Sequence, residues 1–477
     1  MSWQEYPDVP ADQLDPHADQ LDPGGQARRL AEIHNGQARM AYRLSAEYAD
    51  RLLYVHGIGW HAWDGRRWAE DRRGLAKRAV LDVLRKALAE SLDDKQLRQD
   101  VRRCESAAGV NGVLDLAAAL RPFAATVADL DADPWLVNLA NGTLDLRTLQ
   151  LRAHDPADRC TKVTDAAYDP ARQDRLDAES ASVWAQFLDR VLPDPDVRGF
   201  VQRLAGIGLY GAVIEHALAI FTGTGANGKS TLTKALGGAL GDYATTAEPE
   251  LFMHRENAHP TGEMDLRGAR WVVVSESDQG RSLAAGTMKR LTGGDPIRAR
   301  RMRQDFVEFL PSHTPILVTN HLPKVRGDDP AVWRRLRVVP FDVVIPPAER
   351  NPHLDEELQA ARDAVLTWAV EGWRDYRARG LAEPESVLAA TDAYQADSDA
   401  VRRFVAECCH VSPSAFVSSG DLFERWQQWA AYDGAEHLSA KALGQALDRL
   451  GYPSAKAGRG LRVRRGIGLL TEDEADE

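Results

Sequence analysis

The stretch "IFTGTGANGKSTLTKAL" (residues 220–236) decides the fold, because an apolar run leads into a glycine-rich loop that opens a helical pattern. The spacing of the glycines and the Lys-Ser pair fits a P-loop, with a strand before it and a helix after it. In such a loop, backbone N–H groups point at phosphate oxygens, and the start of the helix adds its positive dipole end. We therefore expect nine residues to bind ATP: Gly223, Thr224, Gly225, Ala226, Asn227, Gly228, Lys229, Ser230 and Thr231.

Two residues of this loop carry specific chemistry. Lys229 is expected to reach the β- and γ-phosphates, and the Ser230 hydroxyl is expected to bind Mg²⁺. The alternative is a glycine-rich turn that matches the pattern by chance. A P-loop is shared by kinases, GTPases and motors, so the rest of the domain must decide between them.

The region around the loop alternates short apolar runs with helical stretches, which is typical of a parallel-sheet α/β domain. The apolar runs predict four strands, and a helical stretch follows at 350–380; the strands are 217–222, 271–275, 314–319 and 336–341. We assign residues 211–380 to this P-loop domain.

The length of 477 residues predicts about three domains. Residues 1–24, where "ADQLDP" occurs twice, are predicted to be a disordered leader because this composition cannot bury a core. Residues 25–210 are predicted to form a mixed α+β domain. Residues 381–477 contain two helical patterns, a basic hairpin and an acidic tail, and we interpret them as a small winged-helix-like module.

Within the first domain, helices are predicted at 28–48 and at 74–92, where Leu81, Leu84 and Leu88 recur at helical spacing. "GWHAWDGRRW" predicts a hairpin with its turn at Asp64-Gly65. The aromatic residues of this domain fit the core of a hairpin, and the alternative is the stacking of nucleobases; they are Trp60, Trp63, Trp68 and Trp135.

The composition excludes several classes of protein. The sequence has no run of about 18 apolar residues, so no membrane span is indicated. The acidic N-terminus does not fit a secretory signal. The four cysteines form no C-x-x-C pair, which favours a reducing cytoplasm without a disulfide framework or zinc site; they are Cys104, Cys160, Cys408 and Cys409. The net charge of −12 confines any nucleic-acid site to a local basic surface.

Polar residues follow two of the predicted strands, and an arginine pair comes just before a third, at 336–341. Glu276, with Asp278 as second choice, is the candidate to hold the Mg²⁺ shell and polarise a water; a solvated acidic loop is the alternative. Asn320 is the candidate sensor of the γ-phosphate, or else a cap or turn residue. Arg334 and Arg335 can serve a neighbouring subunit's nucleotide as an arginine finger, or else form a surface pair.

The main basic patch spans residues 288–309; within it, four arginines crowd into residues 298–303 and are followed by Phe306 and Phe309. Basic residues on a hairpin suit the phosphates of single-stranded DNA, and an ordinary solvated face is the alternative. The candidate DNA-binding residues are Lys289, Arg298, Arg300, Arg301 and Arg303.

The motifs "GTGANGKST", "VVVSES", "KRLTGGDPIRAR", "TPILVTNHLP" and "VWRRLRVVPF" occur in this order within about 120 residues. Together the chain resembles the superfamily 3 helicases, in their phage, plasmid and poxvirus primase–helicase branch. "NGTLDLRT", "YDP" and "GIGLYG" are similar to the domain that precedes the motor in that branch. The resemblance extends over most of residues 25–470.

The resemblance implies a multidomain α/β protein with an AAA+-like motor, assembled as a homo-hexameric ring around single-stranded DNA and using ATP and Mg²⁺. It implies that Glu276 is the catalytic acid, Asn320 the sensor, and Arg334 or Arg335 the finger acting in trans. Lys289 and residues 298–303 fall in the segment that forms a DNA-facing hairpin in the family. Ser275 stands where many of these helicases have the first of two acids. The resemblance also implies that the protein acts in the cytoplasm of a bacterial host.

Primer synthesis needs paired carboxylates for two metal ions, and only Asp129, Asp131 and Asp133 are dense enough to be candidates. They lie in a predicted loop without a companion histidine motif. We therefore expect no primase module, and cooperation with a separate primase or replication protein. The leading hypothesis is an ATP-driven replicative DNA helicase; the alternative is an ATP-switched DNA-binding initiator or loader without processive unwinding. A small-molecule kinase explains neither the basic patch nor the arginine pair.

Overall fold

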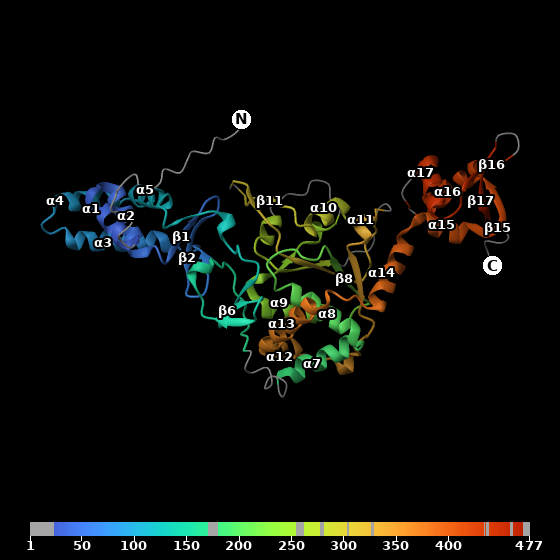
Figure 1. The fold of residues 1–477 in the computed structure, drawn as a ribbon, viewed down its shortest axis with the longest axis horizontal. Helices are drawn as coiled ribbons and strands as arrows, with labels where there is room; N and C mark the ends of the chain where they lie inside the picture. The colour runs from blue at the N-terminus through green and yellow to red at the C-terminus, as the bar shows by residue number, and fades with distance from the viewer. Residues whose placement is uncertain are drawn as a thin grey trace.

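The computed structural model arranges the chain as three parts in a row, with the P-loop domain between an N-terminal unit and a C-terminal module (Figure 1). The structure describes residues 23–169, 180–253, 262–276, 281–302, 305–325, 329–433, 435, 438–457 and 461–470. The predicted leader at 1–24 and the acidic tail lie almost entirely outside these residues.

In the described part of the chain, the central domain is built on a five-stranded sheet with the order β14-β8-β13-β10-β9. All neighbouring strands are parallel. The strands are β8 (Leu218–Thr222), β9 (Ala244–Ala247), β10 (Trp271–Glu276), β13 (Thr314–Thr319) and β14 (Leu336–Pro340). The four strands predicted from apolar runs are confirmed, and β9, which is short and rich in Thr and Ala, is an addition.

Alternate residues of β8 enter different cores, because side chains of a strand alternate between its two faces. Ala219 and Phe221 pack into a core with α7 (Ser180–Val191), α8 (Pro195–Ile207), α9 (Lys229–Leu240) and α13 (Arg362–Arg379). Leu218 and Ile220 pack into a second core with α10 (Ala285–Leu291) and the strands β11 (Ile297–Ala299) and β12 (Val307–Phe309). The sheet is therefore covered on both faces.

The segment before the P-loop shares the core of the central domain. A small antiparallel sheet of β5 (Leu136–Leu139), β6 (Gly142–Asp145) and β7 (Gln150–Arg152) packs with α7 and α8 into the same core as Phe221 and Trp373. The expected boundary at residue 210 therefore does not separate two hydrophobic cores.

The N-terminal unit combines helices with a small sheet of order β3-β2-β1-β4. Its helices are α1 (Pro23–Ile33), α2 (Gly36–Tyr48), α3 (Leu75–Glu90), α4 (Lys95–Cys104) and α5 (Ala107–Ala118). Its strands are β1 (Leu52–Val55), β2 (Gly59–Trp63), β3 (Trp68–Glu70) and β4 (Ala124–Ala125). The single helix expected at 28–48 is two helices, which meet at His34-Asn35.

The helix predicted at 74–92 is confirmed as α3. Leu84 is buried, but Leu81 and Leu88 are 51% and 43% exposed. The helix instead buries a face of smaller residues, among them Val80 and Val83. This face of alanines and valines packs against α2 and α5.

The tryptophans of the N-terminal half lie in aromatic clusters. Trp63 packs on Trp68 across the β2–β3 hairpin with ring centroids 5.8 Å apart, and Trp60 makes an edge contact with Phe123. Trp135 packs edge-on against Tyr210 at 5.0 Å. These contacts support the interpretation of the four tryptophans as core residues.

The C-terminal module follows α14 (Glu385–Ser398), which packs on β14 and leads out of the central domain (Figure 1). Its elements are α15 (Ala400–Cys408), β15 (Cys409–Ser418), α16 (Ser419–Asp433), α17 (Ala440–Arg449), β16 (Ser454–Lys456) and β17 (Arg462–Leu469). The two expected helices and the basic hairpin are present, and α15 and β15 complete a core in which Cys408 and Cys409 are buried. Among the described helices, none has the length and apolar character needed to cross a membrane.

Candidate nucleotide site and DNA interface

The glycine-rich loop joins the end of β8 to the start of α9, and two of its glycines are required by their surroundings. A Cβ on Gly223 would lie 2.4 Å from the carbonyl oxygen of Phe341, and one on Gly228 would lie 2.4 Å from the Val191 side chain. Both residues have positive φ, at 155° and 85°. The loop therefore turns tightly between β14 and α7, as a phosphate-binding loop must.

Lys229 is held by neutral oxygens. Its side chain is buried, and its Nζ donates to the Gly223 carbonyl at 2.8 Å, to Asn227 Oδ1 at 3.0 Å and to Asn320 Oδ1 at 3.2 Å. Burial lowers the pKa of this ammonium group because it removes water from a charge. A phosphate at the loop would supply the counter-charge that the three neutral acceptors do not.

The segment that follows β14 supports the loop. Asn227 Nδ2 donates to the Phe341 carbonyl at 3.0 Å, and the Ile345 N–H donates to the Ala226 carbonyl at 2.8 Å. Sequence reasoning missed Phe341 and Ile345 as loop supports. Both act through the backbone, so their side chains carry no recognisable signal.

The predicted catalytic residues Glu276 and Asn320 lie at the ends of neighbouring parallel strands. Thr222, Thr319 and Glu276 form one row across β8, β13 and β10, and Asn320 follows directly after Thr319. Because neighbouring strands lie about 4.8 Å apart, the Glu276 backbone is roughly 10 Å from the strand that opens the loop. Asn320 is thus on the strand between them, where it contacts Lys229. Asp278 lies outside the described residues.

The arginine pair lies at the other end of the sheet. Leu336 pairs with Leu218 at the start of β8, whereas the P-loop follows Thr222 at its end. Arg335 is buried, and its Nη1 donates to the Ala331 carbonyl at 2.6 Å in α11 (Pro330–Trp333). Arg334 is exposed. Neither arginine faces the P-loop of its own chain.

The basic patch does form a hairpin, in which β11 pairs antiparallel with β12. Phe309 is buried in the core, whereas Phe306 is 43% exposed. The guanidinium groups of Arg298 and Arg300 lie 4.9 and 4.6 Å from the centre of the Phe306 ring. An exposed aromatic ring flanked by two cations is suited to a nucleobase and its phosphates.

Two other predicted DNA contacts are already paired with carboxylates. Lys289 Nζ lies 2.7 Å from Asp329 Oδ2. Arg301 makes a bidentate pair with Glu70 of the N-terminal unit, at 2.9 and 3.0 Å. Arg303 lies outside the described residues.

The three aspartates considered for metal binding are each engaged separately. Asp129 accepts from the Thr126 N–H and hydroxyl, Asp131 accepts from Thr161, and Asp133 pairs with Arg147; these contacts cap a turn or join neighbouring loops. Within the residues that the structure describes, no three His, Cys, Asp or Glu side chains gather as a metal site would require.

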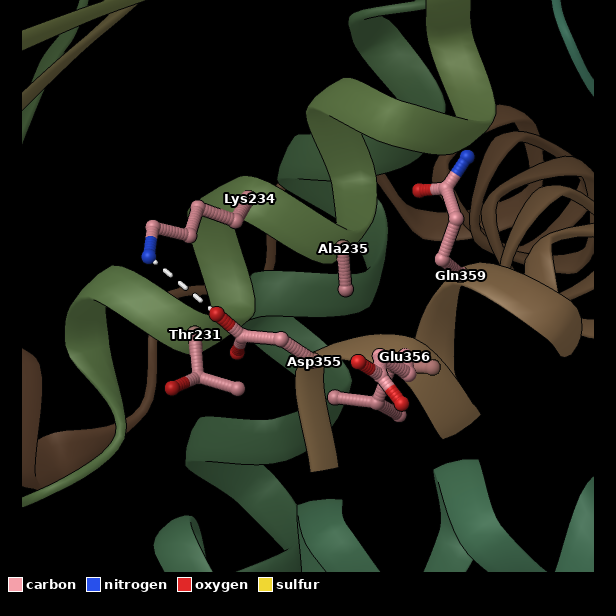
Figure 2. A pocket seen from close by; sticks show the side chains of 7 residues that line it. Thr231, Lys234, Ala235, Asp355, Glu356 and Gln359 are labelled. Carbon is pink, nitrogen blue, oxygen red and sulfur yellow. Dashed lines mark hydrogen bonds and ion pairs between the residues drawn. The ribbon is translucent and has the colours of Figure 1, made fainter. Parts of the chain in front are cut away.

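A pocket lies on the flank of α9, one turn beyond the loop (Figure 2). Thr231, Lys234 and Ala235 line it from α9, and Asp355 and Glu356 line it from α12 (Leu354–Ala360). Lys234 spans its rim to Asp355 at 3.2 Å, as the dashed line in Figure 2 marks. Lys229 and Ser230 are not part of its wall, so the pocket adjoins the predicted nucleotide site and shares Thr231 with it.

The parallel sheet, the glycine loop at the end of β8 and the buried lysine define the class: a multidomain α/β protein with a P-loop-like domain. Residues 41–193 match the family model described as "D5 N terminal like", and residues 221–335 match a family of unknown function, DUF5906. These two matches and the viral relatives below fit a phage or viral primase–helicase family.

Proteins of large DNA viruses are similar to this chain. "Putative helicase L207/L206" of Acanthamoeba polyphaga mimivirus is 27% identical over 67% of this chain and 35% of its own length. "Putative helicase 022R" of Frog virus 3 (isolate Goorha) is 26% identical over 55% and 29%. "Putative primase C962R" of African swine fever virus (strain Badajoz 1971 Vero-adapted) is 23% identical over 61% and 32%. The chain thus spans about a third of the length of these relatives.

Among solved structures, the apo C-terminal region of NrS-1 aligns with 67% of this chain and 87% of its own length. The sequence identity is 12% and the TM-score 0.38, a likeness too slight to carry an argument.

Proposed function

We propose that the protein is an ATP-dependent DNA helicase that translocates on single-stranded DNA during replication of a phage, plasmid or integrated element. The observation that carries the proposal is the contact between Lys229 of the P-loop and Asn320 at the tip of the neighbouring strand. A phosphate-binding residue and a polar strand-end residue in contact can couple the state of a nucleotide to the position of a strand.

The residues have distinct roles in the proposed hydrolysis of ATP to ADP and phosphate. The loop N–H groups and Lys229 bind the β- and γ-phosphates. Glu276 accepts the proton of the attacking water, and Asn320 orients that water. The Ser230 hydroxyl and the Glu276 carboxylate are oxygen ligands of the kind that Mg²⁺ prefers. A Mg²⁺ ion held by them would neutralise charge on the phosphates.

An arginine finger from a neighbouring subunit completes the proposed site. Arg334 is the better candidate, because it is exposed at the edge of the sheet opposite its own P-loop, whereas Arg335 is buried and bonded to Ala331. A residue placed in this way can serve only another subunit. This arrangement supports an AAA+-type homo-hexameric ring, which works in the cytoplasm of a bacterial host, where a separate primase can act on the same DNA.

The hairpin is the proposed DNA-binding element, with Arg298 and Arg300 on phosphates and Phe306 against a base. The order of elements from α15 to β17 supports a winged-helix-like C-terminal module.

The proposal is tested by the rate of ATP hydrolysis with and without single-stranded DNA. The purified protein should hydrolyse ATP faster when single-stranded DNA is added, and Lys229→Ala should abolish both rates. A rate of hydrolysis that is indifferent to DNA would contradict a motor.

A further inference from the structure

One carboxylate of the N-terminal unit contacts two arginines of the central domain. Glu70 ends β3, and both of its oxygens accept hydrogen bonds from Arg301, at 2.9 and 3.0 Å. Arg267 donates to the same carboxylate at 3.0 Å. Arg301 follows the hairpin strand β11, and Arg267 lies four residues before β10, the strand that ends in Glu276. Glu70 therefore joins the hairpin to the root of the strand that carries the proposed catalytic acid.

The ion pairs of Glu70 are partly shielded from solvent. The Glu70 side chain is 20% exposed and that of Arg267 11%, whereas Arg301 is 39% exposed. A phosphate that displaced Glu70 from Arg301 would leave a half-buried carboxylate with one partner fewer, which is costly. Arg298 and Arg300, by contrast, have cation–π contacts with an exposed ring and are free to meet a strand.

Apolar contacts seat the hairpin on the same unit. Val307 of β12 lies so close to Gly57 that a Cβ there would be 3.0 Å from its Cγ1. Ile58 and Val127 belong to the N-terminal unit and pack against its small core. Both also pack against the core of the central domain that contains Val307 and Phe309. These contacts hold the two parts together, and the paired charges fix one orientation at their edge.

We propose that Glu70 is a positioning residue for the DNA-binding hairpin: by holding Arg301 it fixes the hairpin so that Arg298, Arg300 and Phe306 meet single-stranded DNA. This inference rests on the proposed function. In this arrangement Arg301 does not bind a DNA phosphate; it ties the hairpin to Glu70 of the N-terminal unit. The opposite arrangement, in which Arg301 binds phosphate and Glu70 competes for it, predicts effects of the opposite sign.

The first test is the affinity for a labelled oligonucleotide, measured by anisotropy over a range of salt concentrations. Glu70→Gln should weaken binding by roughly 5-fold or more, a typical coupling between two sites. Its dependence on salt should stay that of the wild type, since no phosphate contact is lost. Arg300→Gln should lower the slope of log affinity against log salt by about 0.7, the value for one phosphate on a single strand.

A second variant separates tethering from phosphate binding. Arg301→Lys keeps the positive charge but loses the fork that makes two bonds to Glu70. If Arg301 is a tether, this variant should weaken DNA binding as Glu70→Gln does, and combining the two should weaken it no further. Tighter binding by Glu70→Gln, or near-normal binding by Arg301→Lys, would show Arg301 to be a phosphate ligand and overturn the inference.

The matched control is Asp433→Asn in the C-terminal module. Asp433 also makes a bidentate pair, with Arg403 at 3.0 Å for both bonds, and the exposures of 20% and 36% are nearly those of the Glu70 pair. This variant should bind DNA as the wild type does. An equal loss in both variants would mean that any broken ion pair weakens binding, and the inference would fail.

Hydrogen exchange gives a readout that needs no DNA. The amides of residues 297–299 and 307–309 should exchange faster in Glu70→Gln than in Asp433→Asn, while those of β8 and β13 stay protected. Wild-type protein that binds no single-stranded DNA would refute the proposed function. Wild-type protein that binds DNA, with Glu70→Gln equal to it in binding and exchange, would refute only the role of Glu70.

Discussion

At the scale of single residues, the P-loop lysine Lys229 donates a hydrogen bond to Asn320 at 3.2 Å. Lys229 is satisfied by the Gly223 carbonyl, Asn227 and Asn320, all of them neutral. In the proposed site, a bound phosphate would give the ammonium group a charged partner that these three oxygens do not supply. The proposed nucleotide-binding residue and the proposed sensor thus share one hydrogen bond.

This geometry predicts the effect of nucleotide on thermal stability. A ligand present at 100 times its Kd should stabilise the wild type by about 2.7 kcal/mol. Lys229→Ala should lose this increase in Tm, measured by calorimetry with Mg²⁺ and ATP. Lys234→Ala, on the same helix but 69% exposed and paired with Asp355, should keep it. A Lys229→Ala protein that is still stabilised by ATP would contradict the assignment of the loop.

The junction at Glu70 predicts a dependence on pH. Burial raises the pKa of this carboxyl, but the hydrogen bonds and charge of Arg301 and the charge of Arg267 outweigh burial and hold it at about 2, below the ordinary 4.5. A lowered pKa stabilises the folded protein above pH 4.5, and this contribution is lost as the pH falls from 4.5 towards 2. The difference in Tm between wild type and Glu70→Gln should therefore be full at pH 7 and shrink below pH 4.5. A difference that grows in acid would mean that Glu70 is not paired in solution.

At the scale of elements, the hairpin divides its residues between two tasks. Ile297, Ala299, Val307 and Phe309 are buried, while Arg298, Arg300 and Phe306 are exposed. The alternation of strand side chains produces this division, since one face must pack on the core and the other is left to solvent.

The exposed face predicts a loss of DNA affinity when its aromatic ring is removed. Phe306→Ala should weaken the binding of single-stranded DNA by about 1–3 kcal/mol, the usual contribution of one stacked base. Leu310→Ala, an exposed apolar residue just beyond β12, is the control and should bind normally. Equal affinities of the two variants in the same titration would argue against stacking on Phe306.

The elements also show what the sequence could predict. The strands β8, β10 and β13 are buried on both faces, so their apolar runs could be recognised in the sequence; β14 could be recognised from Val338 and Val339 although it contains Arg337. Strand β15 was missed because Val411 and Phe416 are exposed and no apolar period marks it. The P-loop was recognisable from its own residues, but the pairing of Arg301 with Glu70, 231 positions apart, depends on the packing of two units. The same limit concealed that Arg335 is buried while Arg334 is not.

At the scale of the whole molecule, Arg334 is exposed at the end of the sheet opposite the P-loop of its own chain, and in the proposed ring it serves a neighbour's nucleotide. Arg334→Ala should therefore abolish ATP hydrolysis without changing nucleotide binding. A mixture of Arg334→Ala and Lys229→Ala should recover part of the activity. Some subunit interfaces in the mixture combine an intact P-loop from one variant with an intact Arg334 from the other. Mixtures in which neither variant restores activity to the other would indicate that each chain hydrolyses ATP alone.

In the proposed function, ATP hydrolysis moves this protein along a single strand and separates a duplex. The most direct measurement is strand displacement from a duplex with a single-stranded tail, in the presence of Mg²⁺ and ATP. We predict displacement that requires hydrolysable ATP and the tail, and that Lys229→Ala abolishes. Hydrolysis stimulated by single-stranded DNA without any displaced strand would contradict the helicase and leave an ATP-switched initiator or loader.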